Sequence, residues 1–137
     1  MLIRNILEES VRKFDEVKAV KWLKKKEIME RSYGELMENV VSTRKGLLAE
    51  GFEGKHIALI GTSSVEWMES YLGIITGCTT AVPLDAALPC EDLIDLLNRS
   101  DSAALFLSPK LKPYLDAFLE NYPKLQKVWM HQEEVED

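Results

Sequence analysis

Three short apolar runs, at residues 56–60, 80–84 and 103–107, punctuate the middle of this chain. None of them alternates with polar residues, and continuous apolar strands are typical of parallel sheets that are covered on both faces. The segments between the runs, at 65–76 and at 93–97, carry apolar residues at helical spacing instead. This pattern predicts two successive strand–helix–strand units with their helices packed on the sheet.

Capping and turn residues mark the ends of these helices. Ser63 and Glu66 have the Ser-x-x-Glu spacing of a capping box, in which each side chain bonds a free backbone N–H. Gly77 is expected to end the first helix in the left-handed conformation, and Pro89 suits the first turn of the second. The apolar positions that we expect the first helix to bury are Val65, Met68, Leu72 and Ile75.

The two ends of the chain continue the alternation. The sequence predicts helices at 5–14 and 112–121, and a last strand at 127–130. Strands at 19–23 and 28–32 flank three lysines at 24–26 and predict a hairpin with a solvated loop. The apolar side of the helix at 112–121 is expected to hold Leu115, Phe118 and Leu119.

A second capping-box pair, Ser32 and Glu35, opens a helix that we expect to end at Gly51. The chain is therefore predicted to be a single α/β domain over residues 1–137, with a mostly parallel sheet flanked by helices and a short antiparallel hairpin near the N-terminus. The apolar face of the helix ending at Gly51 is expected to comprise Leu36, Val40, Leu47 and Leu48, with Arg44 and Lys45 turned outward. The residues expected on inner faces of the central units are Ile57, Leu59, Trp67, Leu72, Val82, Leu97 and Leu105.

Composition narrows the class of protein. The chain has 137 residues, of which 46% are hydrophobic and 29% charged, as is usual for a globular domain. A formal charge of -6 would repel a phosphate backbone, so nucleic-acid binding is not expected. No apolar run is long enough to span a bilayer, and residues 1–5 lack the pattern of a signal peptide. With two cysteines and no paired metal motif, reduced thiols in the cytoplasm are expected.

Four side chains could serve a ligand, and each also has a plain structural interpretation. Ser63 and Ser64 follow a strand and precede a helix, where ligands often bind in α/β sheets, but helix capping needs no ligand. Asp85 could face a crevice, but Asp also favours turns. Cys90 lies in the first turn of a helix, where its pKa could be lowered, but without a partner His or Cys we expect a structural thiol.

Other residue types point to packing more than to chemistry. Trp67 fits a buried helix face, so we expect core packing rather than cofactor stacking. His56 and His131 have no neighbouring ligand residue, and the acidic run at 133–137 is typical of a solvated end. No nucleophile elbow and no Gly-x-Gly-x-x-Gly motif occurs. The sequence therefore assigns no catalytic, cofactor-binding or metal-ligating residue.

Several motifs nonetheless resemble a known family in their order and spacing. They are Arg-Ser-Tyr-Gly-Glu-Leu at 31–36, Val-Glu-Trp at 65–67, Thr-Thr-Ala-Val-Pro-Leu-Asp at 79–85, Leu-Pro at 88–89 and Leu-Asn-Arg-Ser-Asp at 97–101. Together with the helix at 5–14, they resemble the start of the adenylate-forming acyl-CoA ligases, the AMP-dependent synthetase family, and the long-chain branch most of all. Two departures are Ser63-Ser64-Val65 in place of the usual Asn-Ser-Pro, and Gly77-Cys78 in place of Ala-Gly.

The resemblance implies a parent enzyme that activates a carboxylic acid, with a fatty acid favoured, using ATP and Mg²⁺, and passes the acyl group to coenzyme A. The family's Ser/Thr/Gly-rich loop ending in Lys and its catalytic Lys do not occur here, since no Lys follows Gly77-Cys78-Thr79-Thr80. We therefore expect an N-terminal structural portion that is inactive alone, that packs against the remainder of the parent chain and that can self-associate.

A free-standing flavodoxin-like binding or signalling module is the alternative. A phosphorylation-receiver version would need carboxylates after the strand at 56–60, where the chain has Gly61-Thr62-Ser63-Ser64. A flavin-binding version would need a hydroxyl-rich, phosphate-cradling loop, and the same four residues match one only weakly.

Overall fold

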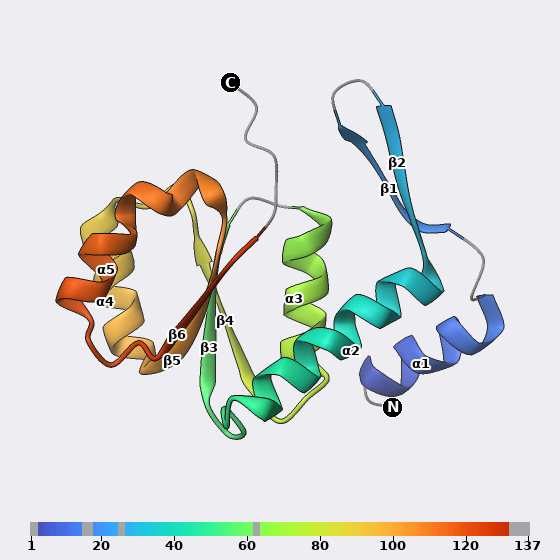
Figure 1. The fold of residues 1–137 in the computed structure, drawn as a ribbon, viewed down its shortest axis with the longest axis horizontal. Helices are drawn as coiled ribbons and strands as arrows, with labels where there is room; N and C mark the ends of the chain where they lie inside the picture. Colours follow the sequence, from blue (N-terminus) through green and yellow to red (C-terminus); the bar gives the residue numbers. More distant parts are fainter. Residues whose placement is uncertain (1–2, 15–17, 25–26, 62–63, 132–137) are drawn as a thin grey trace.

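The computed structural model describes residues 3–14, 18–24, 27–61 and 64–131 (Figure 1). Its centre is a four-stranded sheet of β3 (His56–Gly61), β4 (Thr80–Asp85), β5 (Ser102–Leu107) and β6 (Lys127–Met130). The strands are all parallel and lie in the order β4-β3-β5-β6. The predicted mostly parallel α/β fold is confirmed, and the last strand has the predicted bounds.

Helices cover both faces of this sheet, as Figure 1 shows. One face carries α2 (Tyr33–Ala49) and α3 (Val65–Ile75), and the other carries α4 (Cys90–Ser100) and α5 (Leu115–Asn121). A 3-10 helix, η1 (Pro109–Tyr114), precedes α5, where the sequence predicted one continuous helix from 112. Pro113 accounts for the difference, because a proline cannot donate the backbone hydrogen bond of a helix interior.

Two apolar clusters fill the spaces between the sheet and the two helical layers. Successive side chains of a strand point to opposite faces, so β3 contributes Ala58 and Ile60 to one cluster and Ile57 and Leu59 to the other. Ile57, Leu59, Leu97 and Leu105 are fully buried as predicted, whereas Val82 on the edge strand β4 is half-buried. Pro83 lies on that same edge strand, where a missing N–H is tolerated.

The predicted hairpin forms a separate two-stranded sheet of β1 (Lys18–Lys24) and β2 (Glu27–Ser32). The strands are antiparallel, with Leu23 opposite Ile28, and Figure 1 shows the hairpin reaching away from the main sheet. The helix α1 (Ile3–Phe14) packs against α2. Of the lysines expected in the loop, Lys24 ends β1, and the other two lie outside the described residues.

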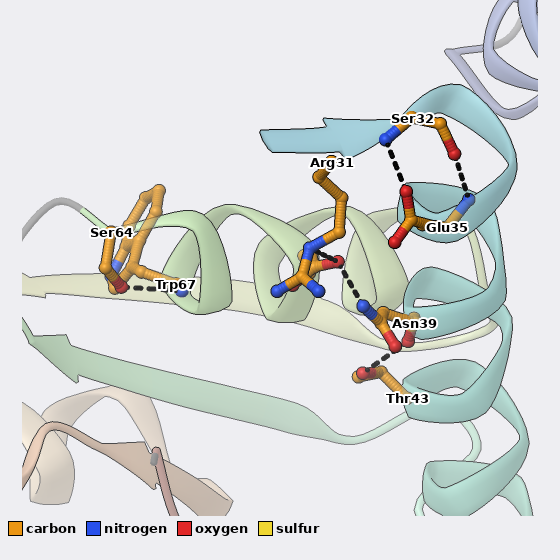
Figure 2. Close-up of polar contacts among 8 residues, drawn as sticks. Arg31, Ser32, Glu35, Asn39, Thr43, Ser64 and Trp67 are labelled. Carbon is orange, nitrogen blue, oxygen red and sulfur yellow. Dashed lines mark hydrogen bonds and ion pairs between the residues drawn. The ribbon is translucent and has the colours of Figure 1, made fainter. Parts of the chain in front are cut away.

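Helix caps agree with the sequence at one helix and shift by one residue at another. The Ser32–Glu35 capping box opens α2: the Glu35 N–H donates to Ser32 Oγ at 3.1 Å and the Ser32 N–H donates to Glu35 Oε1 at 3.0 Å (Figure 2). The N-cap of α3 is Ser64, which accepts from the Trp67 N–H at 3.0 Å, rather than the predicted Ser63, a residue outside the described ones.

Helix ends show a similar mixture. Gly51 follows α2 with φ 79°, as expected for a glycine stop. Gly77 does not take the predicted left-handed conformation, and α3 ends instead at Thr76, whose hydroxyl donates to the Leu72 carbonyl. The left-handed residue at the end of α4 is Asp101 (φ 51°), which the sequence did not signal.

The buried face of α3 differs from the prediction. Val65, Met68, Leu72 and Ile75 are only half-buried. The face is rotated because α3 packs against α2 as well as the sheet. A Cβ on Gly73 would lie 2.6 Å from Thr43 Cβ, so the two helices approach closely there. The buried residues of α3 are Glu69, Ser70, Gly73 and Ile74.

Three further positions on the helices were predicted wrongly. Leu48 and Leu119 are each 45% exposed, because neither lies on the face that its helix buries. Arg44 is half-buried rather than turned outward, since its aliphatic carbons pack near Gly77. Leu36, Val40 and Leu47 are buried as predicted, and Lys45 is exposed. No helix among the described residues has the length and apolar character needed to cross a membrane.

The close approach of α2 and α3 predicts that Gly73→Ala destabilises the fold. The new methyl group would meet Thr43 and lie 3.0 Å from the Val40 carbonyl oxygen, and such overpacking costs about 1–3 kcal/mol. Gly46→Ala is the matched control, because nothing lies within 4 Å of its added Cβ and alanine favours a helix interior by about 0.5–1 kcal/mol. In urea unfolding, the midpoint should be lower for Gly73→Ala than for the unaltered chain and higher for Gly46→Ala. An unchanged midpoint for Gly73→Ala would contradict the helix packing.

Trp67 was expected in the core, but it is half-buried and stacks on Tyr71 with ring centroids 5.4 Å apart. Truncation to Ala should therefore cost about 1–2 kcal/mol. Truncation of the fully buried Phe118 to Ala should lower the free energy of unfolding by about 3–5 kcal/mol. Chemical denaturation of the two variants side by side measures the difference, and equal losses would show that Trp67 is packed as tightly as Phe118.

Candidate functional site

A crevice lies at the carboxyl ends of the central strands, where ligands bind in open α/β sheets. After β3 the chain passes to β4 on one side and then to β5 on the other, so the connections diverge at this end of the sheet. The crevice has a volume of about 520 Å³. We call it the switch-point crevice, and its lining residues are Gly61, Trp67, Leu84, Asp85, Ala86, Ala87, Ser108, Lys110 and Leu111.

The floor of the switch-point crevice is the meeting of β3 and β5. Gly61 ends β3, and a Cβ there would lie 3.1 Å from Ser108 Cβ and 3.5 Å from a ring carbon of Trp67. The Ser108 N–H donates to the Ile60 carbonyl at 2.9 Å, which holds the two strand ends together. A side chain at position 61 would therefore be crowded by Ser108, and glycine leaves the backbone open at this point of the crevice.

The walls combine apolar and charged groups. Trp67 from α3 forms one wall, and Asp85 with the two alanines after it forms another. Asp85 Oδ1 accepts the Ala87 N–H at 2.9 Å, so its carboxylate makes the predicted turn even though it borders the crevice. Lys110 supplies the one cation among the lining residues, and it is exposed. This mixture suits a ligand with an apolar part and an anionic part.

The structure separates the remaining sequence candidates from the crevice. Cys90 is half-buried against the apolar cluster under α4, which fits the structural interpretation. His56 lies at the opposite end of β3, where its Nδ1 is 2.7 Å from the Ser100 carbonyl oxygen. His131 follows β6 and is buried, with Nε2 3.0 Å from Ser70 Oγ and its ring near Phe106.

Ser108 and Lys110 are crevice residues that sequence reasoning missed. Both follow the end of an apolar strand, which is the signal that drew attention to Asp85. The same rule, applied after residue 107, would have found them. Ser64 was considered as a ligand residue, and its side chain is used to cap α3.

A second gathering of polar groups lies away from the crevice, between the hairpin, α2 and α3. Glu69 of α3 is 4% exposed, and its Oε2 accepts from Asn39 Nδ2 of α2 at 2.6 Å. The same oxygen lies 3.2 Å from Arg31 Nε of β2 (Figure 2). Burial raises the pKa of Glu69 above its ordinary value of 4.5, against the opposing effects of the Asn39 hydrogen bond and the Arg31 charge. The sequence did not predict that Glu69 is buried, because a charged residue is not expected on the buried face of a helix.

The charged residues that line the crevice are Asp85 and Lys110. Among residues 3–14, 18–24, 27–61 and 64–131, no three His, Cys, Asp or Glu side chains gather as metal ligands would. One exposed lysine does not reproduce a phosphate-binding loop, in which several backbone N–H groups and a lysine act together.

Solved structures of larger enzymes share this fold. The anthranilate CoA ligase AuaEII in complex with anthranoyl-AMP superposes with a TM-score of 0.84 at 18% identity, covering 96% of this chain and 25% of that one. The N-terminal domain of FACL13 from Mycobacterium tuberculosis superposes with a TM-score of 0.84 at 18% identity, covering 95% of this chain and 34% of that one. A fatty acyl CoA synthetase from Mycobacterium tuberculosis superposes with a TM-score of 0.83 at 18% identity, covering 95% of this chain and 26% of that one. The chain thus spans about a quarter to a third of the length of these relatives.

Sequence comparison adds the assignment that fold similarity at such identities does not give. No curated protein sequence matches the chain. The family model described as AMP-binding enzyme, however, matches residues 7–136. Because that match covers nearly the whole chain, the chain belongs to the AMP-binding enzyme family, as the motifs at 31–36 and 65–101 indicated.

Proposed function

We propose that this chain is the N-terminal structural portion of an AMP-forming acid–thiol ligase, folded as a single domain over residues 1–137. The observation that carries the proposal is the family match over residues 7–136, together with coverage of only 25–34% of the ligase chains described above. The same match favours this function over a free-standing flavodoxin-like module.

The parent enzyme would activate a carboxylic acid, with a fatty acid favoured, in the cytoplasm. A carboxylate is a poor electrophile until one of its oxygens joins a good leaving group. ATP with Mg²⁺ would provide this as an acyl-adenylate, and coenzyme A would then take the acyl group. One structural relative supports the fatty substrate through its own description as a fatty acyl CoA synthetase, while another is described as an anthranilate CoA ligase.

This chain's own contribution would be a scaffold and one wall of a larger site. The switch-point crevice opens at the carboxyl edge of the sheet, where Trp67 and Leu111 offer apolar surface and Lys110 a positive charge. A wall of this kind could meet a ligand held mainly by residues from the rest of the parent chain. The apolar lining would exclude water from that side of the ligand.

The first prediction from this proposal is that the isolated chain does not form an adenylate. The Ser/Thr/Gly-rich loop ending in Lys and the catalytic Lys do not occur in the sequence, so ATP phosphates would have no cradle. ATP–pyrophosphate exchange with a panel of fatty and aromatic acids is the measurement, with an active acyl-CoA ligase as the positive control. Exchange above a no-protein blank that rises with the amount of chain would overturn the structural-portion proposal.

The second prediction is self-association at high protein concentration. The hairpin strands β1 and β2 pair with each other and with no further described strand, so each has an outer edge that another chain can extend. A portion of a larger enzyme also exposes apolar surface that the rest of the enzyme would cover. Sedimentation equilibrium over a wide concentration range should show dimers or larger species.

A charge on the hairpin edge tests where the contact lies. Val20→Lys should weaken association, because a lysine on an edge strand opposes strand addition. Asp95→Lys on the distant helix α4 is the control and should leave association unchanged. A chain that stays monomeric at every concentration would favour an independent module over the proposed portion.

A further inference from the structure

The hairpin leaves the body of the molecule beside a buried acid. The strand β2 runs directly into α2 at Ser32, and Arg31, one residue earlier, forms an ion pair with Glu69 of α3. The side chain of Glu69 is 6% exposed and that of Arg31 is 24% exposed. This ion pair joins the hairpin to a helix packed on the main sheet.

One oxygen of Glu69 holds both neighbours. Oε2 accepts from Asn39 Nδ2 at 2.6 Å and lies 3.2 Å from Arg31 Nε, and Figure 2 shows Arg31 and Asn39 approaching from different elements. The Asn39 contact needs only an oxygen lone pair, whereas the Arg31 contact gains most from the negative charge. The two neighbours therefore respond differently to a proton on the carboxylate.

The charged groups that act on Glu69 come from each element packed against it. Arg31 on β2 favours the carboxylate, while Glu66 on α3 and Glu35 on α2 oppose it. Burial opposes it most strongly, and the result is a pKa above the ordinary value of 4.5.

Protonation would change one contact and spare the other. A proton on Oε1 leaves the carbonyl Oε2 able to accept from Asn39, so α2 and α3 stay joined. The charge attraction to Arg31, whose side chain is 24% exposed, is lost. We propose that Glu69 is a proton-dependent latch, which holds the hairpin to the α/β body when it is ionised and releases the hairpin when it is protonated.

The latch gives global and local stability opposite responses to pH. Because the pKa of Glu69 is raised in the folded protein, the folded chain binds more protons than the unfolded chain between 4.5 and the raised pKa. The contribution of this group to the free energy of unfolding is therefore fully present below pH 4.5 and falls as the pH rises through the folded pKa. The attachment of the hairpin changes the other way, since it needs the ionised form.

Hydrogen exchange of backbone amides, corrected for the intrinsic pH dependence of exchange, separates the two responses. In the unaltered chain, lowering the pH from 7.5 to 4.5 should reduce protection in β1 and β2, relative to β3, on the order of 5- to 30-fold. Glu69→Gln, a neutral residue of the same shape, should show weak hairpin protection at every pH while β3 keeps its protection. Arg31→Gln removes the cation of the same ion pair, so it should also show weak hairpin protection at every pH while β3 keeps its protection.

Asp95→Asn is the matched control, because it removes an exposed ion pair with Arg99 on α4 and should behave as the unaltered chain does. Hairpin protection in the unaltered chain that is independent of pH would overturn the latch. So would a Glu69→Gln hairpin that keeps either its full protection at pH 7.5 or its pH dependence. Glu69→Gln could also lose protection in β3, which would mean that the whole fold is destabilised. In that case Arg31→Gln is the deciding variant, and hairpin protection that still depends on pH in Arg31→Gln would refute the proposal.

Discussion

The burial of β3 and β5 on both faces is the constraint on which the rest of the structure depends. Ile57, Ala58, Leu59 and Ile60 are all inaccessible to solvent, as is every residue of β5 to within a few per cent. A parallel sheet cannot join neighbouring strands by tight turns, so each connection must cross a face of the sheet, and helices are the connections that satisfy their own backbone groups. The apolar sequence of the two strands then requires a helical layer on each side.

This arrangement also determines where a site can form. Since the chain extends from β3 first to one side and then to the other, the helices that follow β3 and β4 leave in different directions. The switch-point crevice lies at this edge of the sheet, and it is lined by Gly61 and Ser108, where a Cβ on Gly61 would lie only 3.1 Å from Ser108 Cβ. The same backbone geometry that buries the core therefore leaves one edge open for a ligand or for another part of an enzyme.

Sequence reasoning succeeded where one physical effect determines the structure. Apolar strands such as 103–107, the capping box of Ser32 and Glu35, and the turn at Asp85 are local signals, and all were found in place. The errors occurred where a second neighbour acts. The face of α3 was predicted from its fit to the sheet alone, and the contact with α2 through Gly73 rotated it toward Glu69. Arg44 packs its aliphatic carbons beside Gly77, which has no side chain, and a contact between such distant residues leaves no local sequence pattern.

The candidate site was harder to predict than the fold for a related reason. Gly61, Asp85 and Ser108 are far apart in the sequence and come together because three parallel strands end at one edge. Their roles depend on strand order, and strand order follows from long-range packing rather than from periodicity. The family motifs supplied the assignment that local physics could not, because they preserve the order of these strand ends along the chain.

Two kinds of interaction thus divide the molecule. Within the α/β body, apolar packing against the sheet is insensitive to pH and commits both helical layers to one arrangement. At the hairpin, the described ion pair with the body runs through a carboxylate whose burial works against its own charge. A buried ion pair of this kind specifies orientation more than it adds stability, because desolvation offsets much of its attraction. The hairpin can therefore be held in one direction without being part of the core, which suits an element that has an edge free to pair elsewhere.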